Sequence, residues 1–150
     1  MSIIRIQGTE LSYHESDIIT FAEGMIGLPH LRRMVLISQS DIEPFLWLAS
    51  LDDPSVVFLV IEARGVFPDY APSVPEAVRT ALGMTAQETP LMLTIALITP
   101  EWTNSTINLR APLIVSPVTM RAAQIVLSDS AYRLDQQLPV QSSESVAVAG

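Results

Sequence analysis

Two adjacent carboxylates, Asp52 and Asp53, are the side chains whose type and spacing first suggest chemistry. Two carboxylates can act as general acid and base when both converge on one reacting bond from different environments. Neighbouring residues in an extended segment point apart, however, and Asp52-Asp53-Pro54-Ser55 has the composition of a tight turn. We therefore expect these carboxylates to form a turn between antiparallel strands rather than a catalytic pair.

The sequence lacks the usual signatures of metal binding and catalysis. His14 and His30 have no second ligand at a metal-binding spacing, and the chain has no cysteine. It contains no glycine-rich phosphate loop, dinucleotide fingerprint or Gly-x-Ser-x-Gly elbow. We expect no metal, no cofactor and no catalytic residue. A small β-barrel enzyme that uses one buried carboxylate, or a ligand-binding barrel with an open interior, stays open as an alternative.

Composition and charge narrow the class of partner. The 150 residues are 49% hydrophobic and carry a formal net charge of −8, which predicts one folded domain and no direct nucleic-acid binding. The acidity would steer a basic partner toward the protein, or it would serve only to keep a hydrophobic chain in solution. No signal-peptide pattern and no apolar run of about 20 residues occurs, so we expect a cytoplasmic protein without membrane contact.

Short apolar runs separated by turn residues predict a mainly β fold, a small antiparallel β-barrel or sandwich. The predicted strands are residues 3–7, 17–21, 34–38, 45–51, 56–62, 91–99, 106–111, 113–116 and 123–127. Gly24 and Gly27 are expected where the backbone needs a positive φ or a close approach. Residues 1–138 are expected to form a single domain, and residues 139–150 a flexible tail.

One short helix is predicted at about residues 73–83. Ser73 is the expected N-cap, and Glu76, three residues later, would complete a capping box. The apolar residues that follow recur at helical spacing and form one stripe. Gly83 is placed where a helix commonly ends.

Several polar and aromatic residues outside the predicted core are candidates for binding a partner. Trp102 lies between two predicted strands, where it would either anchor a partner or pack over one end of the barrel. Alternation in residues 106–111 places Asn108 and Arg110 on the face opposite the apolar residues. The candidates are Asp52, Asp53, Asp69, Tyr70, Trp102, Asn108 and Arg110.

Three segments, in order along the chain, resemble a known family. Residues 21–29 (Phe-Ala-Glu-Gly-Met-Ile-Gly-Leu-Pro) are similar to its F-x-x-G-x-x-G-hydrophobic-P segment. Residues 44–54 (Pro-Phe-Leu-Trp-Leu-Ala-Ser-Leu-Asp-Asp-Pro) and residues 106–115 (Thr-Ile-Asn-Leu-Arg-Ala-Pro-Leu-Ile-Val) carry the rest of the likeness. With these segments, which span about residues 3–138, the chain resembles the FliW family of bacterial flagellar assembly factors.

The resemblance implies a β-rich fold, no catalysis and two protein partners. Proteins of this family bind the dimeric RNA-binding regulator CsrA and relieve its repression of flagellin translation. They also bind flagellin near its C-terminal end, so that free flagellin titrates the factor away and secretion of flagellin releases it again. The resemblance also implies a protein that is monomeric before it binds either partner.

Overall fold

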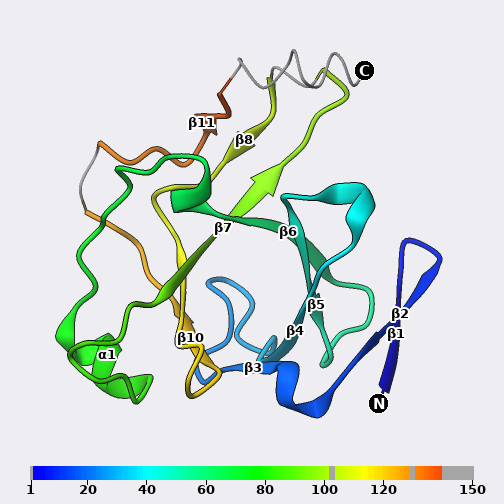
Figure 1. Ribbon diagram of the computed structural model, residues 1–150, viewed down its shortest axis with the longest axis horizontal. Helices are drawn as coiled ribbons and strands as arrows, with labels where there is room; N and C mark the ends of the chain where they lie inside the picture. The colour runs from blue at the N-terminus through cyan, green and yellow to red at the C-terminus, as the bar shows by residue number, and fades with distance from the viewer. Residues whose placement is uncertain (1, 102–103, 129–130, 140–150) are drawn as a thin grey trace.

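The computed structural model describes residues 2–101, 104–128 and 131–139. Seven of its strands close into a barrel (Figure 1). The first five follow one another as an antiparallel meander: β3 (Ile18–Phe21), β4 (Arg33–Ile37), β5 (Leu46–Ser50), β6 (Val57–Glu62) and β7 (Leu91–Leu97). The other two, β9 (Leu113–Val115) and β10 (Arg121–Gln124), seal it, because β9 pairs with both β7 and β10. The mainly β prediction is confirmed, and the barrel is the form that it takes.

One pair of barrel strands departs from the antiparallel expectation. β10 runs parallel to β3, with Arg121 opposite Thr20 and Ala122 opposite Phe21. β10 also begins earlier and ends earlier than the predicted strand at residues 123–127. A parallel pair needs a long connection between its strands, so no local turn signal in the sequence reveals it.

The remaining elements lie outside the closed barrel. A separate hairpin of β1 (Ser2–Ile6) and β2 (Thr9–Tyr13) lies at one side, and β8 (Thr106–Ile107) and β11 (Gln136–Gln137) extend the far end of β7 (Figure 1). Three short 3₁₀ turns and one helix complete the fold: η1 (Glu15–Asp17), η2 (Ser40–Ile42), η3 (Ala63–Gly65) and α1 (Glu76–Ala81). None of the helices in the described ranges is long and apolar enough to cross a membrane.

Alternation along the barrel strands divides the apolar residues into three clusters. One face of each strand fills the interior, with Phe21, Leu48 and Leu93 fully buried. The opposite face of β4 and β5 packs beneath the β1–β2 hairpin. The opposite face of β6, β7 and β9 packs beneath α1, its flanking segments and residues 123–127 and 132–138. β5 and β6, whose sequences are apolar on both faces, are therefore buried on both the inner and the outer side of the barrel.

The helix is shorter than predicted, and its start is different. Pro75, not Ser73, is the N-cap, with a φ of −57° and a ψ of 143°, and no side chain caps the first turn. Because a residue before proline is driven into extended conformation, the helix cannot begin before Pro75, and the Ser73 capping box was wrong. The predicted end is confirmed, since Gly83 follows the helix with a φ of +69° and its N–H donates to the Thr80 carbonyl.

The connection between β3 and β4 depends on glycine, as the sequence predicted. Gly24 has a φ of +72°, and a Cβ built on it would lie 2.5 Å from the carbonyl oxygen of Pro29. Gly27 has a φ of +80°, and its Cβ position is open. Met25 and Leu28 exchange backbone hydrogen bonds of 3.2 and 2.8 Å around this turn. The loop therefore folds back on itself so closely that only glycine fits at position 24.

Candidate partner-binding surface

Asp52 and Asp53 lie in the turn that joins β5 to β6, which we call the acidic turn (residues 51–55). The Ser50 Oγ accepts hydrogen bonds from the N–H groups of Asp52 and Asp53, at 3.1 and 2.9 Å. The Asp53 carboxylate accepts from the Ser55 N–H at 3.2 Å and from the Ser55 hydroxyl at 2.7 Å. The prediction that this segment forms a tight antiparallel turn is confirmed.

The Asp52 carboxylate holds a neighbouring segment in place. Its Oδ2 accepts from the backbone N–H groups of Arg32 and Arg33 at 2.8 and 2.7 Å, and the Arg33 Nε lies 3.7 Å from its Oδ1. The backbone hydrogen bond from Arg33 is the main reason that the pKa of Asp52 is lowered. Asp52 thus ties the end of the β3–β4 connection to the acidic turn, and much of its charge is already satisfied within the protein.

Asp53 presents its charge further outward. The hydrogen bonds from Ser55 lower the pKa of its carboxyl group, and the His30 Nε2 lies 3.9 Å from its Oδ2. Its side chain is 38% exposed, against 28% for Asp52. Of the two carboxylates, Asp53 is therefore the better placed to meet a basic partner.

Tyr70 lies in the core rather than on the surface. It is 3% exposed, and its hydroxyl donates a 2.6 Å hydrogen bond to the Leu109 carbonyl. Its ring meets that of Tyr132 edge to face, with centroids 5.0 Å apart, and burial raises the pKa of its hydroxyl. Tyr70 therefore anchors its own segment, which lies between η3 and α1, to the backbone at Leu109, and it is not available for direct contact with a partner.

Asn108 and Arg110 belong to the same neighbourhood as Tyr70. The Asn108 Oδ1 accepts from the N–H groups of Arg110 and Ala111, at 3.1 and 3.0 Å, and this bond breaks the strand predicted over residues 106–111. The Arg110 Nε donates to the Tyr132 carbonyl at 3.0 Å. Both side chains are half-buried. We call Tyr70, Asn108, Leu109, Arg110 and Tyr132 the tyrosine cluster.

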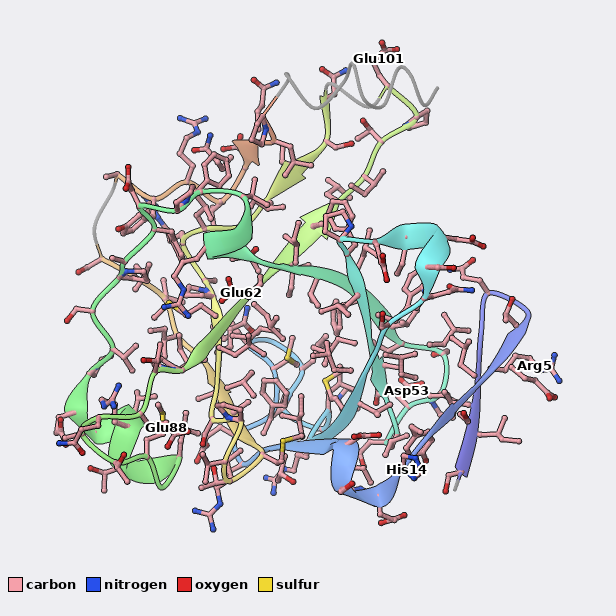
Figure 2. The ribbon with its side chains drawn as sticks, viewed as in Figure 1. Arg5, His14, Asp53, Glu62, Glu88 and Glu101 are labelled. Atoms are coloured by element: carbon pink, nitrogen blue, oxygen red, sulfur yellow. The ribbon has the colours of Figure 1, made fainter. Side chains whose placement is uncertain are left out.

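The candidate residues therefore fall into two groups rather than one acidic face. Asp52 and Asp53 precede β6, whereas the exposed Asp69 follows it, and a strand of six residues is about 20 Å long. Figure 2 shows Asp53 on the side of the barrel near the hairpin, well apart from Glu62 at the other end of β6. Trp102 lies outside the described residues. No signal in the sequence tells on which side of the barrel each loop lies.

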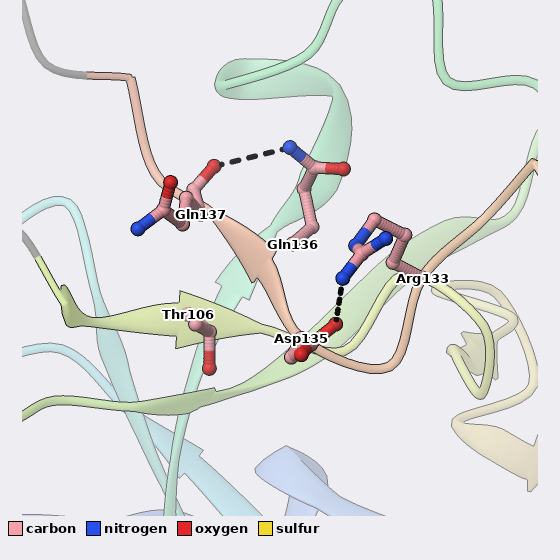
Figure 3. A pocket seen from close by; sticks show the side chains of 5 residues that line it. All are labelled: Thr106, Arg133, Asp135, Gln136 and Gln137. Atoms are coloured by element: carbon pink, nitrogen blue, oxygen red, sulfur yellow. Dashed lines mark hydrogen bonds and ion pairs between the residues drawn. The ribbon is translucent and has the colours of Figure 1, made fainter.

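An open hollow of about 360 Å³ lies between β8 and the segment that leads into β11 (Figure 3). Its lining is polar, and it includes the ion pair of Arg133 with Asp135 at 3.1 Å. The other lining residues are Thr106, Gln136 and Gln137. A partner helix that docks through an apolar stripe requires an apolar groove, which this hollow does not provide.

Two alternative functions were left open by the sequence. A ligand-binding barrel would require an open interior, and an enzyme would require a carboxylate with a raised pKa. The interior is occupied by packed side chains, so a ligand there would have to displace residues such as Phe21, Leu48 and Leu113. A catalytic acid would need a raised pKa, whereas hydrogen bonding lowers the pKa values of Asp52 and Asp53. Within residues 2–101, 104–128 and 131–139, no three His, Cys, Asp or Glu side chains gather as a metal site would need.

Comparison with known proteins identifies the class. A family model described as FliW protein matches residues 4–138. The chain is 30% identical over 139 residues to flagellar assembly factor FliW 2 of Desulfotalea psychrophila, covering 93% of this chain and 91% of that protein. It is 35% identical over 130 residues to flagellar assembly factor FliW of Thermotoga neapolitana, covering 86% and 87%.

A crystal structure of the flagellar assembly factor FliW has the same fold. Its TM-score is 0.82 at 23% identity, over 91% of this chain and 96% of that one. Fold and relatives together define a small, filled β-barrel of the flagellar assembly factor class. The chain belongs to the FliW family.

Proposed function

We propose that this chain is a non-enzymatic, cytoplasmic flagellar assembly factor that binds a CsrA-type RNA-binding regulator and flagellin as competing partners. Bound to the regulator, it relieves repression of flagellin translation; free flagellin draws it away and restores repression. The observation that carries the proposal is the family match over residues 4–138, which spans almost the whole described chain. The protein is monomeric before it binds.

Charge supports the regulator as one partner. A protein that binds RNA needs a basic surface to displace counterions from phosphates, and this chain carries a net charge of −8. Docked beside such a surface, the acidic barrel would disfavour RNA by repulsion and by volume. Asp53, whose side chain is more exposed than that of Asp52, and the exposed Asp69 are proposed to contribute, whereas Asp52 holds the acidic turn in shape.

The other candidates have supporting roles in this proposal. Trp102 is proposed as an aromatic anchor for a partner. Tyr70, Asn108 and Arg110 act indirectly, since their hydrogen bonds fix the backbone around Leu109. Their substitution would alter binding by disturbing the surface above them.

A competition titration tests the proposal. The purified protein is titrated by calorimetry with flagellin and with the CsrA-type regulator of the same bacterium, separately and then together. We expect binding to each and displacement of the regulator by flagellin. Simultaneous binding of both without displacement would contradict the switch, and binding to neither would contradict the function itself.

The residue assignment has its own test, in which Asp53→Lys and Asp69→Lys are compared with Asp41→Lys. Asp41 is exposed in η2, so the control changes net charge equally at another place. We expect Asp53→Lys and Asp69→Lys to slow association with the regulator several-fold and to weaken its dependence on salt. If Asp41→Lys slows association as much, net charge rather than these two positions governs the encounter.

A further inference from the structure

The β1–β2 hairpin is attached to the barrel differently from every other strand in the described ranges. Its two strands form a sheet of their own, whereas the others join one continuous sheet. No hydrogen bond or ion pair joins residues 2–13 to the rest of the described chain. Figure 1 shows the hairpin lying against one side of the barrel. In the described residues, it is held there by apolar side chains alone.

The hairpin has its own local determinants of structure. Its two-residue turn, Gln7-Gly8, has φ values of 53° and 81°, and two positive values in succession are typical of the turn that best matches twisted hairpins. Arg5 pairs with Glu10 across the strands at 2.6 Å. Five cross-strand pairs extend from Ser2–Tyr13 to Ile6–Thr9. These features join the two strands to each other without any contact with the barrel.

The segment that connects the hairpin to β3 is closed on itself. The His14 N–H donates to the Asp17 carboxylate at 3.0 Å, and the Asp17 N–H donates to the His14 carbonyl at 2.8 Å. This compact turn, η1, links hairpin and barrel, and it is joined to β3 by the Ile18 N–H, which donates to the Glu15 carbonyl. It supplies a pivot that survives movement of the hairpin.

We propose that the β1–β2 hairpin is a hinged cover, which opens as a unit while the barrel stays closed. Opening exposes the outer apolar face of β4 and β5, where Val35, Ile37 and Ala49 are buried when the hairpin is closed. Leu51, the first residue of the acidic turn, and Val57, which follows the turn in β6, pack against the same cluster. Opening therefore also removes the packing beneath both ends of that turn.

The absence of cysteine from the chain allows a direct test by thiol labelling. Val35→Cys places a thiol beneath the hairpin, and Val60→Cys places one inside the barrel. Both valines are 0% exposed and change to a residue of similar size, so the two variants are matched. In native buffer we expect the thiol at position 35 to react with Ellman's reagent at least tenfold faster than that at position 60.

A third substitution identifies the hairpin as the moving part. Ile6 is 4% exposed and belongs to the cluster beneath the hairpin, so Ile6→Ala should hasten labelling at position 35 at least threefold and leave position 60 unchanged. Equal labelling rates at positions 35 and 60 would overturn the proposal. So would a labelling rate at position 35 that rises with urea as steeply as global unfolding does.

Hydrogen exchange of the unmodified protein decides the matter if a cysteine variant fails to fold. An isolated two-stranded hairpin is only marginally stable in water, so the hairpin loses its cross-strand hydrogen bonds readily once it has left the barrel. We expect the cross-strand amides of β1 and β2 to exchange at least tenfold faster than those of β4 and β5, and to depend less on urea. Equal protection of the two sets of amides would show that hairpin and barrel open together, which overturns the proposal.

Discussion

At the scale of single residues, the two carboxylates of the acidic turn differ in their hydrogen-bond partners. Asp52 and Asp53 are adjacent, yet one carboxylate receives two backbone N–H groups of a distant loop and the other receives a hydroxyl within its own turn. Adjacent acidic residues therefore need not be interchangeable.

Asp52→Ala should destabilise the protein by about 1 kcal/mol, because it leaves the Arg32 and Arg33 N–H groups without their carboxylate acceptor. Asp69→Ala, at an exposed position, is the control and should change stability by less than about 0.5 kcal/mol. Urea unfolding at neutral pH measures both variants. An equal effect of the two would mean that the loop does not depend on Asp52.

The same carboxylates should make stability depend on acid. Their pKa values are lower in the folded protein than the ordinary value of 3.8, so their contribution is full above that pH and is lost as the pH falls through the folded values. A double variant, Asp52→Asn with Asp53→Asn, should be less stable than the native chain at pH 7 and closer to it at about pH 2. Urea midpoints between these pH values provide the measurement, and parallel curves would contradict the linkage.

Two glycines of one loop offer a matched pair. Both Gly24 and Gly27 have a positive φ, but only at Gly24 would a Cβ strike backbone atoms. Gly27→Ala should cost about 1–2 kcal/mol for the left-handed conformation alone. Gly24→Ala should cost clearly more, since the Pro29 backbone must also move. Comparable urea midpoints for the two variants would contradict the close approach.

At the scale of elements, one buried hydroxyl anchors the segment that crosses the barrel's side. Tyr70→Phe removes the hydrogen bond to the Leu109 carbonyl and should cost about 1–2 kcal/mol. Tyr132→Phe keeps the edge-to-face ring contact and is the matched control, with a smaller loss expected. Thermal or urea unfolding distinguishes them, and amides near Leu109 should lose protection only in the first variant.

The sequence predicted the elements whose bounds depend on local signals. It did not predict the elements whose bounds depend on contacts with residues elsewhere in the fold. Apolar runs located the strands of the barrel, and Gly83 located the end of the helix. The strand expected over residues 106–111 stops at Ile107, because the Asn108 side chain takes the backbone N–H groups that a strand would use. β2 is absent from the predicted strands because its residues, Thr-Glu-Leu-Ser-Tyr, lack the apolar pattern of a buried strand.

The candidate site was less predictable than the fold. Composition indicated which residues are polar and acidic, but only the closed barrel shows that β6 separates Asp53 from Asp69 and that Tyr70 is buried. A tyrosine in a proline-containing loop looks the same in sequence whether its hydroxyl meets solvent or a backbone carbonyl. Loop residues are positioned by tertiary contacts, so their exposure cannot be read from local pattern.

At the scale of the whole molecule, the filled interior determines stability. Leu93 and Leu97 lie on the same strand, β7, but Leu93 is fully buried and Leu97 is 66% exposed. Leu93→Ala should cost about 2–5 kcal/mol, and Leu97→Ala less than about 0.5 kcal/mol. Urea unfolding of the two variants measures the difference. A small loss from Leu93→Ala would mean that the interior is not close-packed.

The parallel pairing of β10 with β3 determines the order in which the strands can pair during translation. Thr20 cannot meet its partner Arg121 until most of the chain has left the ribosome, whereas β3 to β7 can form in order as hairpins. During that interval both β3 and β7 are open sheet edges, able to pair with other nascent chains. The emergence of β9 and β10 from the ribosome ends this interval, so a translational pause before these two strands emerge would prolong the chain's exposure to aggregation.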